Sequence, residues 1–294
     1  MHSLGIDLGG TKIEGVVLTP EGREKIRLRT PTERDEGYDA IVARVADLYR
    51  RLCREIGGEP HTFGIGTPGS ISPRTGLLRN SNTVCLNGRP VQRDLEAALS
   101  REIAIMNDAN CFALAEATVG AGRNHHVVFG VIMGTGCGGG ISMGGEIVMG
   151  GQGIAGEWGH MSVDPEGERC YCGKRGCVET LISGGGLERR WHDEFGERRE
   201  VPAIIDDFRS GDAGAVAFVA RFLSDFGRCL ANVINLLDPD VVVLGGGLSQ
   251  IDELYSLGVA EVADNVFSDS FETPIVKNQL GDSAGVLGAA LIGC

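Results

Sequence analysis

Clusters of Lys and Arg are missing from the sequence, which has 27 basic against 40 acidic residues and a net charge of -13. Binding to a polyanion requires such clusters, because its phosphates must be neutralised by cations. We therefore expect neither nucleic acid nor an anionic membrane surface as a partner. An uninterrupted run of about 18 apolar residues, the length needed to span a membrane, is also missing.

The N-terminal stretch MHSLGIDLGG lacks the basic start and the long apolar core of a secretory signal. Spaced cysteine pairs of the extracellular kind are missing too, since the nine cysteines are odd in number and scattered. These absences predict a soluble, cytoplasmic protein. Six cysteines are expected to be small buried apolar residues or free thiols, namely Cys53, Cys85, Cys111, Cys137, Cys229 and Cys294.

Two segments begin in the same way, with a short apolar strand that runs into a glycine turn. They are LGIDLGGTK at 4–12 and FGVIMGTGCGGG at 129–140, and the strand-like stretch after each predicts a duplicated β-hairpin. Apolar residues at helical spacing alternate with buried strands elsewhere, which indicates an α/β architecture with mixed sheets. The expected helices cover 38–57, 91–102 and 216–237, and the expected strands cover 63–69 and 241–247.

The chain, at 294 residues and 31.0 kDa, is long enough for two modest domains. We place their boundary in or just after the helix at 110–117, where the second strand and glycine unit begins. This gives an N-terminal α/β lobe at 1–115, a C-terminal α/β lobe at 116–282 and a cleft between them. The last helix, 283–294, is expected to complete the N-terminal lobe. Because it is rich in small residues, we expect it to pack closely against another backbone.

Glycine turns at three places indicate phosphate binding. Gly9 and Gly10 have no Cβ, so the N–H groups of their turn can approach a polyphosphate, and Thr11 and Lys12 add a hydroxyl and a cation. Asp7 ends the preceding strand and is placed to hold Mg²⁺ through water. The residues of the other two loops are Gly134, Thr135 and Gly136, within the run 134–140, and Gly245, Gly246 and Gly247. An ordinary turn is the alternative for any one of them. None has P-loop spacing, and none is a GxGxxG that opens a helix with an acidic residue about 20 positions on.

Residues 170–177, CYCGKRGC, contain three cysteines. These could form a disulfide, a redox centre or a metal site. A disulfide leaves one cysteine unpaired, and a redox pair normally has C-x-x-C spacing. Zinc prefers four tetrahedral sulfur and nitrogen ligands, and with all four from protein it would be structural. Those ligands would be Cys170, Cys172, Cys177 and His160. Gly173 and Gly176 allow a tight wrap, but C-x-C is shorter than the usual spacing, so the residues favour zinc without deciding it.

A carboxylate for proton transfer is expected in the strand, turn and helix of IAIMNDANCFALAEA at 103–117. Asp108 lies at the turn, where it is either a general base or the N-cap of the helix, and the turn alone does not decide. The stretch at 66–90 contains residues that could shape or contact a sugar, namely Pro68, Gly69, Asn80 and Asn82. Amides suit sugar hydroxyls, but turn formation explains either asparagine as well.

Five motifs, in this order, resemble the ROK family of bacterial sugar kinases: DLGGTK, MGTGCGGGI, AGEWGH, CYCGKRGCVET and VVLGGG. The resemblance covers residue 4 to about 290. It implies the two-lobed actin-like ATPase fold, which is ribonuclease H-like, with ATP and Mg²⁺. For single residues it implies Asp108 as catalytic base, Asn107 as a sugar contact and a structural Zn²⁺ at the four ligands. It also implies sugar contacts from Glu157, Glu179 and the second ring nitrogen of His160, with solvated glutamates as the alternative.

Residues 66–90 and NDANC at 107–111 are most similar to the fructokinases of this family. We therefore expect a homodimeric enzyme that phosphorylates the primary hydroxyl of a hexose, converting fructose to fructose 6-phosphate. N-acetylglucosamine, glucose and mannose are the alternative substrates. A sugar-responsive repressor is not expected, because the family's repressors carry a helix-turn-helix domain ahead of the first glycine motif, which begins here at residue 4.

Overall fold

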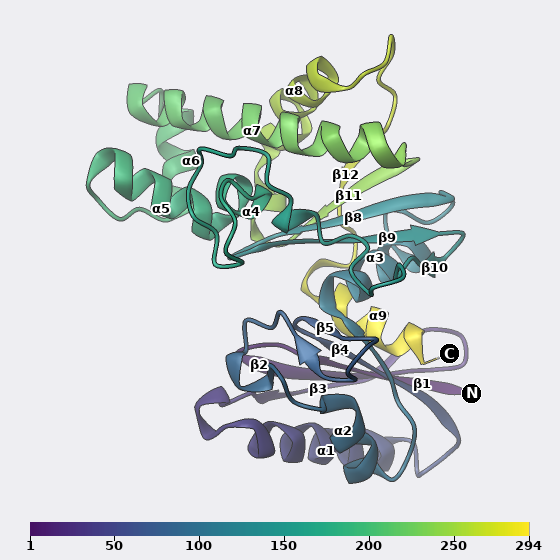
Figure 1. Ribbon diagram of the computed structural model, residues 1–294. Helices are drawn as coiled ribbons and strands as arrows, with labels where there is room; N and C mark the ends of the chain where they lie inside the picture. The colour runs from purple at the N-terminus through teal and green to yellow at the C-terminus, as the bar shows by residue number, and fades with distance from the viewer. Residues whose placement is uncertain (294) are drawn as a thin grey trace. The chain divides into compact units, whose positions relative to one another are not determined.

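The computed structural model describes residues 1–293, which form two compact units (Figure 1). Unit 1 consists of residues 1–115, 147–155 and the chain from 282 onward, and unit 2 consists of residues 116–146 and 156–281. Each unit contains a five-stranded sheet with parallel and antiparallel pairs. The predicted α/β architecture with mixed sheets is confirmed. Within residues 1–293, no helix combines the length and apolar character needed to cross a membrane.

The sheet of unit 1 has the strand order β3-β2-β1-β4-β7. Its strands are β1 (His2–Leu8), β2 (Lys12–Leu18), β3 (Glu24–Pro31), β4 (His61–Thr67) and β7 (Ala104–Asn107). A small hairpin consists of β5 (Ser70–Ile71) and β6 (Leu78–Arg79). The helices are α1 (Tyr38–Glu55), α2 (Val91–Leu99), the N-terminal part of α3 (Asp108–Val119) and α9 (Ala284–Ile292). β1 pairs antiparallel with β2 and parallel with β4, which pairs parallel with β7.

The alternation of residues along β1 decides what each face of the sheet meets. Leu4, Ile6 and Leu8 belong to the apolar core that the sheet forms with α1 and α2. Gly5 and Asp7 point to the opposite face, where they meet α9. The sequence LGIDL therefore buries one side of the strand and presents a carboxylate on the other, beside a helix of small residues.

The packing of α9 requires glycine on both sides of the contact. A Cβ atom on Gly5 would lie 2.4 Å from the backbone nitrogen of Ala290, and one on Gly64 would lie 2.2 Å from a carbonyl oxygen of α9. A Cβ on Gly288 would lie 1.9 Å from the carbonyl oxygen of Cys111 in α3. A larger residue at any of these positions would push α9 away. The prediction that the last helix packs closely against backbone is confirmed.

Residues 147–155 lie within the sequence of unit 2 but fold onto unit 1. The guanidinium of Arg79 donates a hydrogen bond to the carbonyl oxygen of Gln152, with an N–O distance of 2.6 Å. The side-chain nitrogen of Asn110 lies 3.8 Å from the sulfur of Met149. The division expected from the sequence assigned this segment to the C-terminal lobe, so the structure differs from it here. Contacts between residues so far apart in the chain leave no local sequence pattern.

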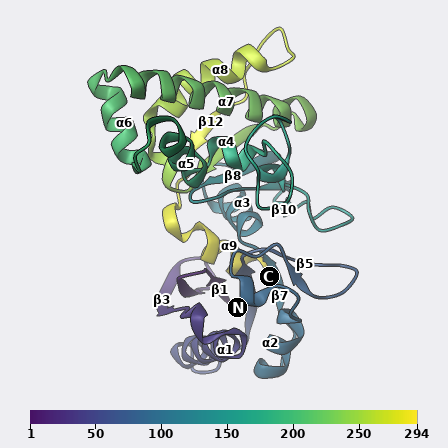
Figure 2. The same cartoon turned by 60° about the vertical axis from the view of Figure 1, so that its left-hand side comes forward.

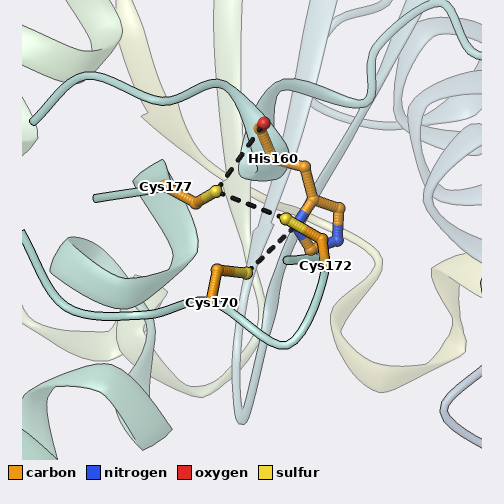
Figure 3. Close-up of side chains that lie close together, drawn as sticks. All are labelled: His160, Cys170, Cys172 and Cys177. Atoms are coloured by element: carbon orange, nitrogen blue, oxygen red, sulfur yellow. Dashed lines mark hydrogen bonds between the residues drawn. The ribbon is translucent and has the colours of Figure 1, made fainter. Parts of the chain in front are cut away.

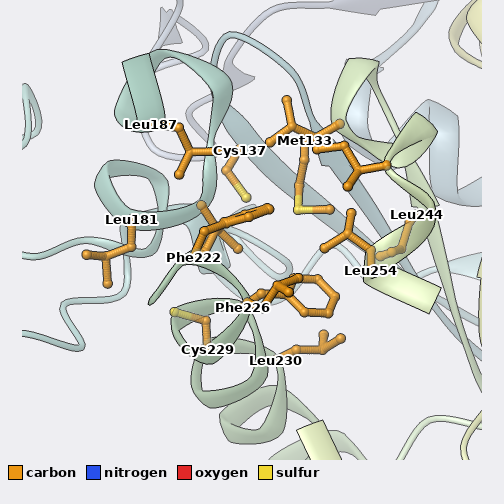
Figure 4. Close-up of a cluster of buried hydrophobic side chains, with 14 of the residues drawn as sticks. Met133, Cys137, Leu181, Leu187, Phe222, Phe226, Cys229, Leu230, Leu244 and Leu254 are labelled. Atoms are coloured by element: carbon orange, nitrogen blue, oxygen red, sulfur yellow. The ribbon is translucent and has the colours of Figure 1, made fainter. Parts of the chain in front are cut away.

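The sheet of unit 2 has the strand order β10-β9-β8-β11-β12. Its strands are β8 (Val127–Met133), β9 (Cys137–Met143), β10 (Glu146–Ile147), β11 (Val241–Gly245) and β12 (Ile275–Lys277). Its helices are α4 (Val178–Ile182), α5 (Gly184–Phe195), α6 (Val201–Ser210), α7 (Ala213–Leu237) and α8 (Leu257–Asn265). Phe222 and Phe226 of α7 share a buried core with Met133 and Leu244 of the sheet (Figure 4). Helices α7 and α8 lie side by side in both views (Figures 1 and 2).

The two predicted hairpins have the same construction. β1 and β8 each contain 7 residues, as do β2 and β9, and residues 9–11 and 134–136 connect the pairs. The predicted duplication is confirmed. The glycine run departs from its prediction, because residues 137–140 lie in β9 and not in a phosphate-binding loop. Glycine in β9 leaves room for a neighbouring segment of the chain, since a Cβ on Gly139 would lie 2.8 Å from the ring of Trp158.

The helices predicted from periodicity are present as α1, α2 and α7. Helix α2 ends at Leu99 and not at 102, because Ser100 adopts a left-handed backbone with φ of 52°. Helices α5, α6 and α8 were not predicted. The expected strands at 63–69 and 241–247 are β4 and β11, each of which ends two residues earlier.

Candidate active site and metal cluster

Two carboxylates of unit 1 lie at the same edge of its sheet. Asp7 is near the C-terminal end of β1, and Asp108 follows β7 as the first residue of α3. Because β1, β4 and β7 are parallel, their carboxyl ends meet at this edge. Burial, followed by the negative charge of Asp108, raises the pKa of Asp7 from 3.8 to about 7. Such a carboxyl group is typical of functional sites, and a bound cation would favour its ionised form.

Asn107 caps helix α3. Its side-chain oxygen accepts hydrogen bonds from the backbone nitrogens of Ala109 at 2.9 Å and Asn110 at 3.4 Å. Its side-chain nitrogen donates to the carbonyl oxygen of Gly69 at 3.2 Å. The sequence left open whether Asp108 is the N-cap of this helix. In the structure Asn107 has that role. The expected sugar contact of Asn107 would come from the remaining N–H of its amide, and it stays a prediction.

Backbone contacts close the first glycine turn. The nitrogen of Gly9 donates to the carbonyl oxygen of Lys12 at 3.0 Å, and a Cβ on Gly9 would lie 2.8 Å from that oxygen. The hydroxyl of Thr32 donates to the carbonyl oxygen of Gly9 at 2.6 Å. Gly10 and the exposed Thr11 complete the turn. This backbone contact is enough to explain why position 9 is glycine. It is therefore no evidence for the predicted phosphate contact, which stays a prediction.

The cation of this turn has a partner within the protein. Nζ of Lys12 lies 3.0 Å from Oε2 of Glu14, a buried carboxylate that also binds Arg27 and Arg29. Burial opposes the charge of Glu14, but the hydrogen bonds from Arg29, Lys12 and Arg27 hold the pKa of Glu14 below its usual value. Lys12 therefore has a structural role in addition to the phosphate contact predicted for it.

Left-handed residues shape the loop that was expected to contact a sugar. Gly69 has φ of 82°, and a Cβ there would lie 2.3 Å from a carbonyl oxygen of β6. Pro68 beside it is buried. Asn80 has φ of 60°, which supports its turn-forming explanation, whereas Asn82 is exposed and has no left-handed backbone. Of the two asparagines, Asn82 is the better candidate for a ligand contact.

Unit 2 contains a cavity of about 510 Å³ between its glycine loops and helices α5 and α6. Three of the predicted nucleotide-binding residues line it, namely Gly134, Thr135 and Gly247. Gly136, Gly245 and Gly246 belong to the same loops but are not part of the wall. Sequence reasoning missed the rest of the wall, which consists of Gly184, Gly185, Glu188, Val201, Pro202, Ile205, Asp206, Arg209, Leu248, Gln250 and Ile251.

The composition of this wall suits a nucleoside. Val201, Ile205 and Leu248 provide apolar surface for a flat base. Glu188 and Asp206 provide oxygens that can accept hydrogen bonds from hydroxyl or amino groups. A concave, largely apolar site with a few polar groups is the usual form of a small-ligand pocket. The cavity therefore supports the expectation that the glycine loops at 134–136 and 245–247 contact a nucleotide.

The four predicted metal ligands converge in unit 2 (Figure 3). Their ligand atoms all lie within 4.8 Å of one another. The sulfurs of Cys172 and Cys177 are 3.6 Å apart, and Nδ1 of His160 lies 3.6 Å from the sulfur of Cys170. A tetrahedral zinc with bonds of about 2.3 Å places its sulfur ligands roughly 3.8 Å apart, so the cluster fits the ion. The predicted clustering is confirmed, and zinc itself stays a prediction.

Left-handed glycines allow the chain to wrap around this cluster. Gly173 has φ of 93° and Gly176 has φ of 54°. A Cβ on Gly176 would lie 1.7 Å from the carbonyl oxygen of Asp164. The predicted need for glycine at both positions is confirmed. The eight cysteines within residues 1–293 are free, so the disulfide explanation has no support, and Cys294 lies outside the described residues.

Glu179 connects the cysteine cluster to the second glycine turn. It lies in α4, directly after the wrap, and its Oε2 accepts a hydrogen bond from the backbone nitrogen of Cys137 at 2.9 Å. A Cβ on Gly136 would lie 2.6 Å from the same oxygen, so glycine leaves room for the carboxylate. Glu157 is half-buried just before the short 3-10 helix Trp158–His160. The sugar contacts of both glutamates stay predictions.

The second ring nitrogen of His160 has a partner that the sequence did not suggest. It points away from the sulfurs (Figure 3) and lies 3.0 Å from the hydroxyl of Tyr171, the residue between Cys170 and Cys172. The sequence predicted a sugar hydroxyl at this nitrogen, and in the structure a phenol occupies that place.

Comparisons with known proteins agree on one family. A model described as the ROK family matches residues 3–293. The chain is 39% identical to a protein named N-acetyl-D-glucosamine kinase from Pectobacterium atrosepticum, over 98% of this chain and 97% of the relative. A ROK hexokinase from Thermus thermophilus is 33% identical with a TM-score of 0.88, over 100% of this chain and 98% of that one. A ROK glucokinase from Streptomyces griseus, solved with glucose and AMPPNP, is 27% identical with a TM-score of 0.82, over 100% and 99%. These similarities confirm the expected actin-like fold.

Proposed function

The chain belongs to the ROK family and is an ATP-dependent sugar kinase, and we propose that its acceptor is the primary hydroxyl of N-acetylglucosamine. The observation that supports this acceptor is the similarity, over nearly the whole chain, to an N-acetyl-D-glucosamine kinase. The fructose expected from residues 66–90 has no support among the reported relatives. It becomes the second candidate, on the resemblance of that stretch to fructokinases.

The chemistry proposed for unit 1 depends on Asp108. Its carboxylate takes the proton of the primary hydroxyl while the hydroxyl oxygen attacks the γ-phosphorus of ATP. The new bond joins the sugar oxygen to phosphorus, the bond from phosphorus to the β–γ bridging oxygen breaks, and ADP leaves with the electron pair. Asp7 is placed to hold Mg²⁺, which neutralises charge on the phosphoryl oxygens when bound, and the raised pKa of Asp7 fits a cationic partner.

The binding proposed for unit 2 has two parts. The cavity takes the nucleoside, and the turns at 134–136 and 245–247 contact its phosphates through backbone N–H groups. The cluster of His160 and three thiolates holds a structural zinc, because all four ligands come from the protein. By stiffening the wrap, the metal keeps Glu157 and Glu179 in place to accept hydrogen bonds from sugar hydroxyls.

Unit 1 supplies the remaining contacts of the proposal. The first glycine turn, from Gly9 to Lys12, is a phosphate contact, and Asn82 is an amide partner for the sugar. Asn80, Asn107 and Gly69 shape the surrounding loop, as their backbone conformations and hydrogen bonds indicate, and Pro68 lies buried beside Gly69.

The acceptor is tested by a coupled ADP-release assay with N-acetylglucosamine, fructose, glucose and mannose, compared as kcat/KM. We expect the kcat/KM for N-acetylglucosamine to exceed that for each of the other sugars by at least about tenfold, since one well-placed polar contact can discriminate to that extent. The variant D108N serves as the control for background ATP hydrolysis. A highest kcat/KM for fructose would select the second candidate, and no ADP release with any of the four would refute the kinase proposal.

A further inference from the structure

Tyr171 combines an exposed ring with a fixed hydroxyl. The residue is 75% exposed. Its hydroxyl nevertheless lies 3.0 Å from Nε2 of His160, and the two rings meet edge to face with centroids 5.1 Å apart. The side chain is therefore held in one orientation at the surface of the cysteine wrap, with its ring open to a ligand.

The chemistry of His160 decides the direction of this hydrogen bond. Nδ1 faces the sulfurs (Figure 3), where a metal ligand must offer its lone pair. A neutral imidazole has one N–H, so Nε2 carries the hydrogen and donates it to the oxygen of Tyr171. A phenol has an O–H of its own. Because Nε2 is the donor in this pair, the O–H of Tyr171 can be donated to a ligand.

The carboxylates near Tyr171 cannot fill this role. Those of Glu179 and Glu157, which act electrostatically on the phenol, only accept hydrogen bonds and so suit sugar hydroxyls. The ammonium group of Lys174 is drawn toward the backbone, where it donates to the carbonyl oxygen of His160 at 3.0 Å. A carbonyl oxygen on the ligand needs a donor, and the phenolic O–H of Tyr171 can provide it.

We propose that Tyr171 is a specificity-determining residue, whose hydroxyl donates a hydrogen bond to the carbonyl oxygen of the 2-acetamido group of the acceptor sugar. This inference rests on the proposed function, because it assumes that the sugar is bound beside Glu157 and Glu179. N-acetylglucosamine and glucose differ only at the 2-position, so one donor at that point separates them. Glucose offers a hydroxyl there, which the carboxylates can bind without Tyr171.

The test is a binding measurement on the zinc-containing protein, made by isothermal titration calorimetry with N-acetylglucosamine and with glucose. We expect Y171F to raise the Kd of N-acetylglucosamine roughly tenfold and to leave the Kd of glucose within about twofold of the wild-type value. The reason is that one hydrogen bond is lost and only one of the two sugars uses it. Y171A should weaken both sugars, since it also removes the ring. The matched control is F267A, which removes another aromatic ring of unit 2 that is 98% exposed and far from the cysteine wrap in sequence.

Zinc content and the melting temperature, measured on each variant, separate recognition from structure. Equal weakening of both sugars by Y171F, or no weakening, would overturn the role of Tyr171 while leaving the proposed acceptor intact. Loss of zinc from Y171F would also overturn it, because the effect would then be structural. A wild-type protein with no preference for N-acetylglucosamine over glucose would refute both the acceptor and the role of Tyr171.

Discussion

The hairpin β1–β2 of unit 1 and the hairpin β8–β9 of unit 2 have equal strand lengths and equal turns, but different neighbours. In unit 1, glycines on one face of the sheet admit helix α9, which lies against Asp7. In unit 2, glycines of β9 admit the segment that carries Trp158 and His160. One framework therefore serves two purposes: the first hairpin places a carboxylate, and the second positions the cluster of His160 with three cysteines.

The same comparison shows what glycine does in each unit. A Cβ on Gly5 would collide with the backbone of α9, and a Cβ on Gly159 would lie 2.0 Å from the carbonyl oxygen of Cys137. In both units, the close approach of a neighbouring segment to the hairpin requires glycine at the contact. The two units differ in the segment that approaches the hairpin. In unit 1 it is a helix that lies over Asp7, and in unit 2 it is a loop that ends at His160.

The largest expected effect separates the chemical role of unit 1 from the binding roles. D108N should lower kcat by about 100- to 10,000-fold, because a general base contributes that much to proton transfer. The amide keeps the size of the side chain, so the Kd of N-acetylglucosamine should stay within about twofold. Steady-state kinetics and calorimetry measure the two quantities. A normal kcat in D108N would remove Asp108 from the base role.

The second prediction concerns the cluster that distinguishes unit 2. C172S should reduce zinc from about one ion per chain to almost none, because a serine hydroxyl does not replace a thiolate ligand. The melting temperature should fall by roughly 10 °C, as loss of about 3 kcal/mol implies for a unit of this size. Mass spectrometry of the metal content checks the first point. C85S, on a cysteine of unit 1, is the matched control, and equal zinc in both variants would refute the ligand assignment.

Glu116 lies where α3 passes from unit 1 into unit 2, and it provides the third prediction. Its buried carboxylate accepts hydrogen bonds from the backbone nitrogens of Ala121, Gln279 and Leu280 at 2.8, 3.2 and 2.9 Å. E116A should lower the free energy of unfolding by about 3 kcal/mol, since it leaves buried donors unpaired.

E116Q should lie between E116A and the wild type, because its amide keeps one accepting oxygen. Denaturant unfolding of the full chain measures these values, with the exposed substitution E102Q as the control. An unchanged free energy of unfolding in E116A would contradict this prediction. It would show that water replaces the hydrogen bonds of the carboxylate without any loss of stability.

The last prediction concerns Asp7. With a folded pKa of about 7 against 3.8 for the free group, the folded state keeps a proton that the unfolded state releases between these values. Stability of the wild type therefore falls as the pH rises through that range, and the loss is complete above pH 7. D7N should remove this loss, so that without Mg²⁺ it is more stable than the wild type at pH 8, with an upper bound of about 4 kcal/mol set by the shift of the pKa.

Denaturant unfolding in the presence of a chelator, at pH 5 and at pH 8, measures this difference. The advantage of D7N should be smaller at pH 5, where the wild-type carboxyl group is still largely protonated in the folded state. A constant difference between the two proteins at both values would mean that Asp7 ionises normally.

Local patterns in the sequence predicted the elements that depend on neighbouring residues. The hairpins, the helices α1, α2 and α7 and the clustering of His160 with three cysteines could be read from spacing and composition. The contacts of Glu116, of Tyr171 and of the segment 147–155 could not, because their partners are distant in the chain or differ from the expected ligand.

The wall of the cavity in unit 2 shows the same limit. Its glycine loops were predicted, but Glu188 and Asp206 come from helices that bear no recognisable motif. Asn87 was missed for a similar reason: its amide exchanges two hydrogen bonds of 2.9 Å with the backbone of Ser81, and an exposed asparagine in a loop gives no sign of it. Side chains that bind backbone are visible only once the chain is folded.

The central claim is that the protein moves the γ-phosphoryl group of ATP to the primary hydroxyl of N-acetylglucosamine. Phosphorus NMR of the reaction of the zinc-containing protein with ATP, Mg²⁺ and this sugar tests it most directly. We predict the signal of a phosphate ester at the primary carbon, formed in equal amount with ADP, and its absence with D108N. Formation of inorganic phosphate or of an anomeric phosphate in place of that ester would contradict the account.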